Sequence, residues 1–464
     1  MRRVRGSVAL RGAIALASAA TLVGALAVGS AQGSSSAPSC ALVASPSGSD
    51  ANSGSLSSPF QTPQKLADSL QAGQTGCLMS GTYDLAGGSS GSQLKFNHGG
   101  ASGAPVTLES YPGQTATITD GPVYVPHGSD YVDVTNLTIN TQGVGEVGIQ
   151  IMGANDQLTD DNITNMNTKG SCIILGSDTG YGQAVAPLVA DNVIHQCGYF
   201  PTDPFEDHGV YDDNTVGSVI TNNIFWGIPY GWGVQLYPDA QGSQVTHNVI
   251  DSNGNGIVVG GNALSASSNN TVAMNIITNS TNEYNIQTWW GGAVGTGNVA
   301  QNNCVNGGNQ GNVESPMSGL TATSNVTADP HYTNATAQDY TLPSSSPCLS
   351  VVGYDTAAAV AASMSSGTPT TPTTPTTPTT PTTPTTPTTT TTLTTITPTI
   401  TTPTTPTSAP VSQPIATAPI PIATSPTATP TPPASTHTTT TTHRHHHRRR
   451  LTRRIRVSHK RHHA

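Results

Sequence analysis

The chain has 464 residues, of which only 9% are Asp, Glu, Lys or Arg, against roughly 25% in an ordinary soluble protein. Four Arg lie in the first eleven residues and nine Lys or Arg lie after residue 442, whereas the segment between them holds three Lys, no Arg and all 25 acidic residues. This segment has a net charge of −22, which excludes a basic surface for nucleic acid.

Residues 1–31 have the organisation of a secretory signal peptide. A basic start with four Arg precedes an apolar, Ala-rich run over residues 12–28, and Gly29-Ser30-Ala31 supplies small residues for cleavage. A membrane anchor that stays in place is the alternative, but Gly and Ser dilute the apolar run. We therefore expect a secreted protein that does not span the membrane after cleavage.

Export makes disulfide bonds the expected state of the six cysteines. Six cysteines allow fifteen connectivities. Sequential pairing is the simplest, because each bond then closes a local segment: Cys40–Cys77, Cys172–Cys197 and Cys304–Cys348. A zinc site is the alternative, but no two cysteines have CxxC spacing.

Residues 38–365 form the predicted structured domain, and they contain an internal repeat. Asn followed by a short aliphatic run recurs every 25 to 31 residues, at Asn136, Asn162, Asn192, Asn223, Asn248, Asn275 and Asn302. A second strand-like run, such as "GIQIMG" or "GIVVGG", lies between successive Asn. Two or more short strands per repeat of about 27 residues, with Gly and Asn at the bends, predict the coils of a parallel β-helix with a ladder of stacked Asn. A β-propeller is the structural alternative, but its period is nearer 40 residues.

The segment "VASPSGSDANSGSLSSPFQTPQKLADSLQAGQTGCLMSGTY" (43–83) precedes this repeat. It resembles the start of secreted right-handed parallel β-helix proteins, a superfamily that includes pectate lyases, alginate lyases and lyases similar to chondroitinase B. The resemblance covers about residues 40–340. It implies an all-β, single-stranded right-handed solenoid with a capping helix at residues 63–70. It implies polysaccharide as a partner, although the same scaffold also carries hydrolases, epimerases and non-catalytic adhesins.

Stacking the coils collects polar and aromatic side chains on one outer face. We align the second strands on Gly148, Ser171, Gly209, Gly233, Gly256 and Asn285. Strand alternation then sends one set of side chains outward, and the set includes Lys169, Asp207, His208, Tyr211, Asp213, Trp232, Gln235, Tyr237 and Trp289. Aromatic rings beside acids and amides suit a glycan groove, and the connections 177–187 and 198–206 flank it. Trp232, Gln235, Tyr237 and Trp289 are the predicted substrate-binding residues.

The stretch "FEDHGVYDDN" (205–214) is the predicted centre of this site. Lys169, which the alignment places directly below Asp207, joins Asp207, His208 and Tyr211 as the predicted catalytic group. A lyase must neutralise a uronic acid carboxylate and remove the adjacent proton. The resemblance implies calcium or basic residues for the first task, and we expect Asp207, Asp212 and Asp213 to hold calcium if the protein uses a cofactor.

Two alternatives to the narrowly preferred lyase remain open. A glycoside hydrolase needs two carboxylates, for which Asp207, Asp213 and Asp239 are candidates. The missing Arg argues against a close match to alginate and chondroitin lyases. A non-catalytic surface or adhesion module is the other alternative. Lys169 then is a solvated turn residue, His208 belongs to a bend, the two Asp cap that bend, and Trp289 covers a coil edge.

The C-terminal hundred residues predict a stalk and a charged tail. Residues 367–442 are a Thr/Pro segment with a "PTTPTTP" repeat, which should be an extended, disordered linker. Residues 443–464 are rich in His and Arg, and they predict electrostatic attachment to an anionic cell-wall polymer. We expect a monomer that is secreted and associated with the cell envelope.

Overall fold

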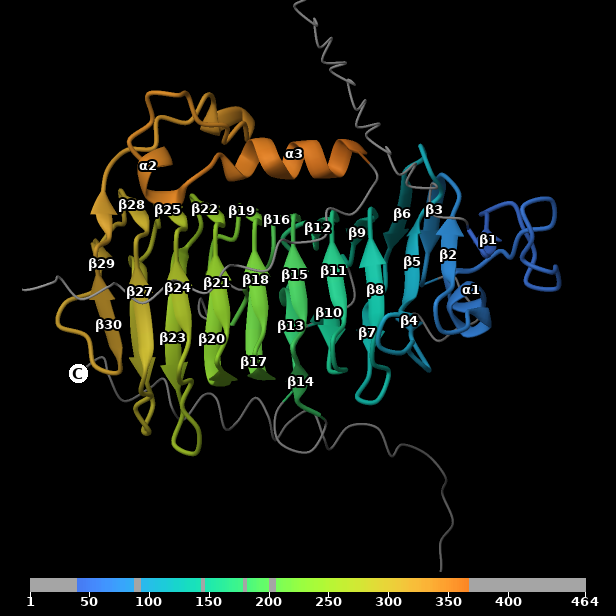
Figure 1. The fold of residues 1–464 in the computed structure, drawn as a ribbon, viewed down its shortest axis with the longest axis horizontal. Helices are drawn as coiled ribbons and strands as arrows, with labels where there is room; N and C mark the ends of the chain where they lie inside the picture. The colour runs from blue at the N-terminus through green and yellow to red at the C-terminus, as the bar shows by residue number, and fades with distance from the viewer. Residues whose placement is uncertain (1–39, 87–92, 143–146, 178–181, 200–205, 367–464) are drawn as a thin grey trace, which may run out of the picture. The chain divides into compact units, whose positions relative to one another are not determined.

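The structure is a computed structural model that describes residues 40–86, 93–142, 147–177, 182–199 and 206–366. The predicted signal peptide, Thr/Pro linker and basic tail lie outside the described residues. Within them the chain coils through three parallel sheets (Figure 1), and the predicted parallel β-helix is confirmed. Successive strands pass from the second sheet to the first and then to the third, and each pairs in parallel with its equivalent in the next coil. The fold is a right-handed parallel β-helix.

The first sheet has eleven strands and runs the length of the domain. Its strands are β1 (Leu42–Ala44), β2 (Thr75–Leu78), β5 (Val106–Ser110), β8 (Val132–Thr135), β11 (Gln157–Thr159), β15 (Leu188–Ala190), β18 (Val219–Thr221), β21 (Gln244–Thr246), β24 (Thr271–Ala273), β27 (Asn298–Gln301) and β30 (Leu320–Thr323).

The second sheet contains the longest strands, and its outer face carries the predicted site. Its strands are β4 (Leu94–Lys95), β7 (Val123–Val125), β10 (Val147–Ile151), β13 (Ser171–Leu175), β14 (Ala184–Val185), β17 (Val210–Val216), β20 (Trp232–Gln241), β23 (Asn255–Gly261), β26 (Tyr284–Trp290) and β29 (Gly311–Val313).

The third sheet faces the C-terminal helices. Its strands are β3 (Gly81–Asp84), β6 (Ala116–Thr119), β9 (Thr138–Asn140), β12 (Asn162–Thr164), β16 (Val193–His195), β19 (Ile224–Trp226), β22 (Val249–Asp251), β25 (Ile276–Thr278), β28 (Cys304–Asn306) and β31 (Val326–Thr327).

Aliphatic side chains stack inside the coils because each strand places equivalent residues in register. In the third sheet the buried stack is Ile139, Ile163, Ile194, Phe225, Ile250, Ile277 and Val305. Each such side chain removed from water contributes about 1.5–3 kcal/mol. The short strands are therefore held by the stack that they build together.

A ladder of asparagines supports one bend of the coils. In each step the backbone N–H and the side-chain Nδ2 of one Asn donate to Oδ1 of the Asn in the next coil, at 2.8–3.1 Å. The members are Asn192, Asn223, Asn248, Asn275, Asn303 and Asn325. Buried backbone groups at the bend are thereby satisfied in each coil of the ladder.

Three predicted ladder positions are off by one residue. Asn136 and Asn302 occupy the preceding bend position with φ of 55° and 53°, a left-handed conformation that Asn tolerates. In the earlier coil Asp161, rather than Asn162, occupies the ladder position. Its N–H donates to Asn192 Oδ1 at 2.8 Å, and its own Oδ1 accepts from Leu137 N.

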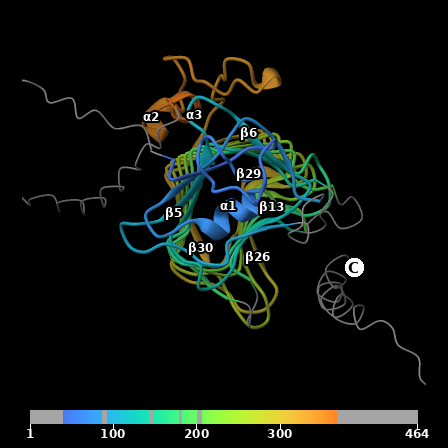
Figure 2. The ribbon, with the colours of Figure 1, turned by 90° about the vertical axis from the view of Figure 1, so that its right-hand side faces the viewer.

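Helices cover an end and a side of the solenoid. Helix α1 (Pro63–Ser69) lies across the N-terminal end of the coils (Figure 2), and Thr62 caps it by accepting from Lys65 N. The predicted capping helix is thus confirmed. The 3-10 turn η1 (Ala335–Ala337), α2 (Leu349–Val352) and α3 (Thr356–Ser366) follow the last coil. The residues of this C-terminal segment, including Val352 and Val360, pack against the outer side of the third sheet.

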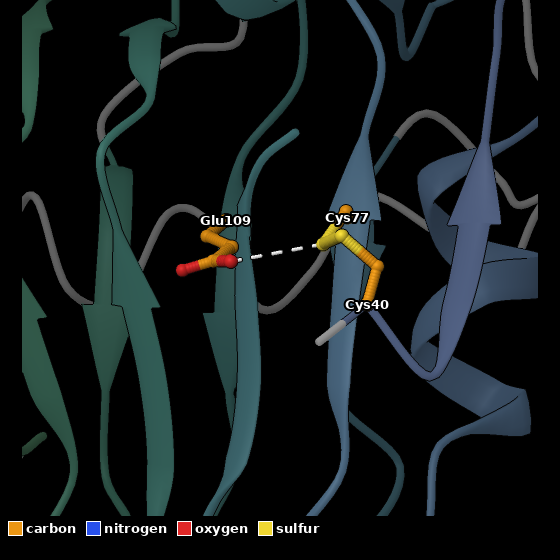
Figure 3. Close-up of side chains that lie close together, drawn as sticks. All are labelled: Cys40, Cys77 and Glu109. Atoms are coloured by element: carbon orange, nitrogen blue, oxygen red, sulfur yellow. Dashed lines mark hydrogen bonds between the residues drawn. A yellow bond between two sulfur atoms is a disulfide. The ribbon is translucent and has the colours of Figure 1, made fainter. Parts of the chain in front are cut away.

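All three predicted disulfides are confirmed: Cys40–Cys77, Cys172–Cys197 and Cys304–Cys348. The first lies beside the buried Glu109, whose carboxyl is 3.6 Å from Cys77 Sγ (Figure 3). Burial raises the pKa of Glu109 to about 7. Because a disulfide sulfur has no hydrogen, the protonated carboxyl is the donor in this contact.

Candidate functional site

Strand β17 carries the polar stretch, and alternation divides its side chains between two faces. Val210 points into the core and pairs with Ile173 and Val234. Tyr211, which is half-buried, faces outward, and Asp212 faces inward between Leu175 and Leu236 of the neighbouring coils. The register then shifts between Asp212 and Asn214. One strand therefore supplies both a polar core group and an outer-face aromatic ring.

Asp212 is a core residue. It is fully buried, and its carboxylate accepts hydrogen bonds from Ser218 Oγ at 2.8 and 3.0 Å and from Ser243 Oγ at 2.7 Å. Burial raises the pKa of Asp212, and bonds from Thr215, Ser243 and Ser218 oppose that rise. The Asp212 side chain links two coils inside the core, on the face of the sheet opposite to Tyr211.

His208 is buried next to Tyr211 and Trp232 and contacts both side chains. It is 2% exposed, and its Nδ1 accepts from Trp232 N at 3.3 Å. A second hydrogen bond joins the ring to the side chain of Gln235. Burial lowers the pKa of His208 to about 3, so the ring is neutral, with its proton on Nε2. Its edge-to-face contact with Tyr211, at 5.3 Å between centroids, holds that phenol in place.

The structure corrects the predicted stacking of Lys169. The coil before β17 is shifted by one residue relative to our alignment, because Val147 pairs with Ser171 and Ile173 pairs with Val210. Gly170, rather than Lys169, therefore stacks on Asp207, and its N–H donates to Asp207 Oδ1 at 2.7 Å. Asp207 is 1% exposed and joins adjacent coils, while Lys169 is half-buried beside it in the turn.

The outer column of the second sheet otherwise follows the prediction. Register places Gln150, Ile174, Tyr211, Gln235, Val258 and Gln287 one above another, with Ile174 in place of the expected Ile173. Trp232 precedes this column by three residues. It is 4% exposed and lies against His208, at 5.6 Å between centroids. Of the four predicted substrate-binding residues, Trp232 is thus buried against His208, and Gln235, which occupies the column, is only 9% exposed.

Tyr237 and Trp289 form a ring pair at the far end of these strands. They lie two coils apart, yet their centroids are 5.4 Å apart in an edge-to-face arrangement. Gly260 stands between them and pairs with Trp289. A Cβ at Gly260 would lie 2.6 Å from Trp289 O and 3.1 Å from Tyr237 Cδ2. The missing side chain therefore lets the two half-buried rings meet, and together they form an aromatic platform.

Carboxylates and amides surround this platform. Burial, and after it the negative charge of the nearby Asp213, raises the pKa of Tyr237 to about 12. Asp239 accepts from Gln241 Nε2 at 2.7 Å. Glu283 accepts from Gln287 Nε2 at 2.7 Å, but it lies in the turn before β26, at the end of the strands where Asp207 lies. Sequence reasoning did not select Gly260, Glu283 or Gln287 as site residues. Their positions in the repeat columns were the signal that could have identified them.

The predicted calcium ligands do not converge. Asp212 faces the core, and Asp207 is held by Gly170. Within the ranges that the structure describes, the one group of three His, Cys, Asp or Glu ligand atoms within 4.8 Å of one another is Cys40, Cys77 and Glu109. Its cysteines are oxidised, so it is no metal centre. A hollow bordered by Val294, Met317 and Leu320 lies at the last coils and contains none of the predicted site residues.

Comparisons with known proteins agree with the fold. A family model described as "Periplasmic copper-binding protein (NosD)" matches residues 91–312, a little under half of the chain. The uncharacterized protein YwoF of Bacillus subtilis (strain 168) is 23% identical over 209 residues, which are 40% of this chain and 42% of YwoF. The chain thus spans about two fifths of the length of this curated relative.

Solved structures with similar folds include carbohydrate-active proteins. XylC in complex with xylose has a TM-score of 0.46 and 12% identity, over 59% of this chain and 69% of that one. Pectate lyase Pel9A has 0.45 and 17%, over 66% and 87%. An alginate lyase from Paenibacillus sp. str. FPU-7 has 0.37 and 18%, over 57% and 96%.

The family description names copper. Among the described His, Cys, Asp and Glu side chains, no group is arranged as a copper-binding site. His208 is enclosed as above, and His195 stacks on Trp226 at 4.4 Å while its Nε2 bonds Asn162 Oδ1. Three disulfides indicate an extracytoplasmic, oxidising compartment. Among the helices of the described ranges, none is long and apolar enough to cross a membrane.

Proposed function

We propose that this protein binds an extracellular polysaccharide along the outer face of its second sheet. The observation that carries the proposal is the platform of Tyr237 and Trp289 over Gly260. Aromatic faces bury the apolar C–H surface of a sugar ring, while nearby amides and carboxylates bond its hydroxyls. Tyr211, which is half-buried, extends this surface on β17, whereas Gln235 and Gln287 of the same column are buried, at 9% and 5% exposed.

The parallel coils suit a polymer. Neighbouring strands lie about 4.8 Å apart, so the half-buried rings of Tyr211 on β17, Tyr237 on β20 and Trp289 on β26 are spread over three strand spacings, roughly 14 Å. A row of rings of this length fits several linked sugars better than one enclosed small molecule. The rigid coils also hold the platform in position before the ligand arrives, which reduces the entropic cost of binding.

Cleavage is the second candidate function, and Tyr211 is the residue that favours it. Its phenol lies at the centre of the outer column and is oriented by the buried, neutral His208. In an elimination Tyr211, as the phenolate, would take the proton beside the uronate carboxylate, and the resulting phenol would protonate the departing glycosidic oxygen. A cation such as calcium from solution would neutralise the uronate. In a hydrolysis Asp213 and Asp239 would supply the two carboxylates. Both nitrogens of His208 are engaged, which leaves it a positioning role.

The test uses the full-length protein with Trp289→Ala, Tyr237→Ala and a matched control, Trp226→Ala, on the third sheet. Affinity for a panel of soluble glycans is measured by calorimetry, with circular dichroism to confirm folding. We expect both platform variants to weaken binding at least tenfold, while Trp226→Ala leaves it within twofold. Equal affinity of all four proteins for every glycan would overturn the proposal.

Catalysis is read in the same samples, with and without calcium. Absorbance near 232 nm reports the unsaturated product of elimination, and reducing ends report any cleavage. Reducing ends without absorbance identify a hydrolase and sink the lyase alternative. Binding with neither signal identifies a non-catalytic module.

A further inference from the structure

The charges around the platform determine which polysaccharide it accepts. Asp213 lies beside Tyr237, and Asp239 follows Tyr237 on the same strand. Both carboxylates belong to the outer side of β17 and β20, at the end of these strands where Tyr237 lies. A ligand on this face therefore meets hydrogen-bond acceptors that are negatively charged.

The three lysines of the domain lie elsewhere. Lys65 belongs to α1 and stands 5.5 Å from the Phe60 ring centroid. Lys95 stands over Tyr124, four strands before β17 in the second sheet, which is roughly 19 Å. Lys169 lies in the turn before β13, beside Asp207 and at the opposite end of the strands from the platform. The chain has no Arg between residues 12 and 442.

We propose that the platform takes an uncharged polysaccharide and discriminates against polyuronates. This inference rests on the proposed function. Vicinal hydroxyls of a neutral sugar donate hydrogen bonds to Asp213 and Asp239, and such bonds to charged acceptors are stronger than those between neutral groups. A uronic acid would instead place its carboxylate beside the same oxygens. Like charges within a Debye length, about 8 Å at physiological salt, repel one another.

Any test has to distinguish binding through the basic tail from binding through the platform, because the nine Lys or Arg after residue 442 will attract polyanions. We therefore compare the full-length protein with Trp289→Ala on a mixed-linkage glucan, a galactomannan, polygalacturonate and alginate. The expected result is at least a tenfold loss on the neutral polymers and less than a twofold change on the polyuronates. Polyuronate retention should also weaken steeply when salt is raised from 20 to 500 mM, as tail binding would.

A second variant tests the charges directly. Asp213→Asn with Asp239→Asn removes two negative charges beside the platform, and Asp68→Asn with Asp329→Asn is the matched control on exposed acids elsewhere. The first pair should raise polyuronate affinity at least threefold at 20 mM salt and the control pair should not.

A loss of polyuronate affinity in Trp289→Ala as large as the loss on neutral polymers would overturn the neutral preference and leave the proposed function standing. No effect of Trp289→Ala on any polymer would overturn both.

Discussion

The bend with the Asn ladder and the outer face of the second sheet are built by the same coils but obey different rules. At the bend nearly every coil uses the same residue, because the same backbone N–H and carbonyl must be satisfied each time. On the outer face the residue changes from coil to coil, through Ile174, Tyr211, Gln235 and Val258. The residues that repeat in each coil are those that the solenoid fold requires. We interpret the outer-face residues that change from coil to coil as those that recognise a ligand.

The largest effect should come from breaking the ladder. Asn248 is fully buried and makes four side-chain hydrogen bonds, to Asn223 N, Asn223 Nδ2, Ile220 O and Asn275 Oδ1. Asn248→Ala leaves buried partners unsatisfied and should cost about 3 kcal/mol of unfolding free energy. Urea denaturation measures it, with the exposed Asn309→Ala as control. A loss below about 1 kcal/mol would contradict the structural role of the ladder.

Asp212 tests whether every departure from repetition lies at the site. Asp212→Ala removes the acceptor of Ser218 Oγ and Ser243 Oγ, whose hydroxyls can then bond each other across 2.9 Å. We expect a loss of about 2 kcal/mol in stability and glycan affinity within twofold for the folded fraction. A large loss of affinity with unchanged stability would return Asp212 to the binding site.

A smaller effect, of opposite sign, should follow from completing the ladder. Asp161 occupies a ladder position with one carboxylate oxygen unpartnered, and burial raises its pKa well above the ordinary value. The amide of Asp161→Asn would donate to Asn192 Oδ1, as Asn do in later coils. We expect a gain of about 1–2 kcal/mol at pH 8.

The pH dependence supplies the control for Asp161. The folded state keeps this proton to higher pH than the unfolded chain, so stability is greatest below the unfolded pKa, about pH 4. Stability falls as pH rises from there towards the raised folded pKa. Asp161→Asn should therefore gain more at pH 8 than at pH 4. An equal gain at both pH values would show that folding does not raise the pKa of Asp161.

Much of the fold was predictable because its determinants are local and repeated. Aliphatic strands, Gly and Asn bends, and sequential cysteines recur in each coil, and the three disulfides and α1 are where the sequence indicated. The site was less predictable, because a register shift of one residue turns every side chain of a strand to the opposite face of the sheet. The coil of Cys172 lacks the Gly used as an anchor, and this misplaced Lys169. Asp212 accepts hydrogen bonds from Ser218 and Ser243, which lie six and 31 residues further along the chain. No local sequence pattern predicts these contacts.

Hydroxyl-radical footprinting of the full-length protein, with and without a saturating neutral glucan, tests the central claim most directly. Tyr237 and Trp289 should be protected from oxidation by the polymer, whereas Trp226, which stacks on His195 on the third sheet, should oxidise at the same rate in both samples. Protection of Trp226 alone, or equal oxidation of all three residues with glucan bound, would contradict the assignment of the binding face.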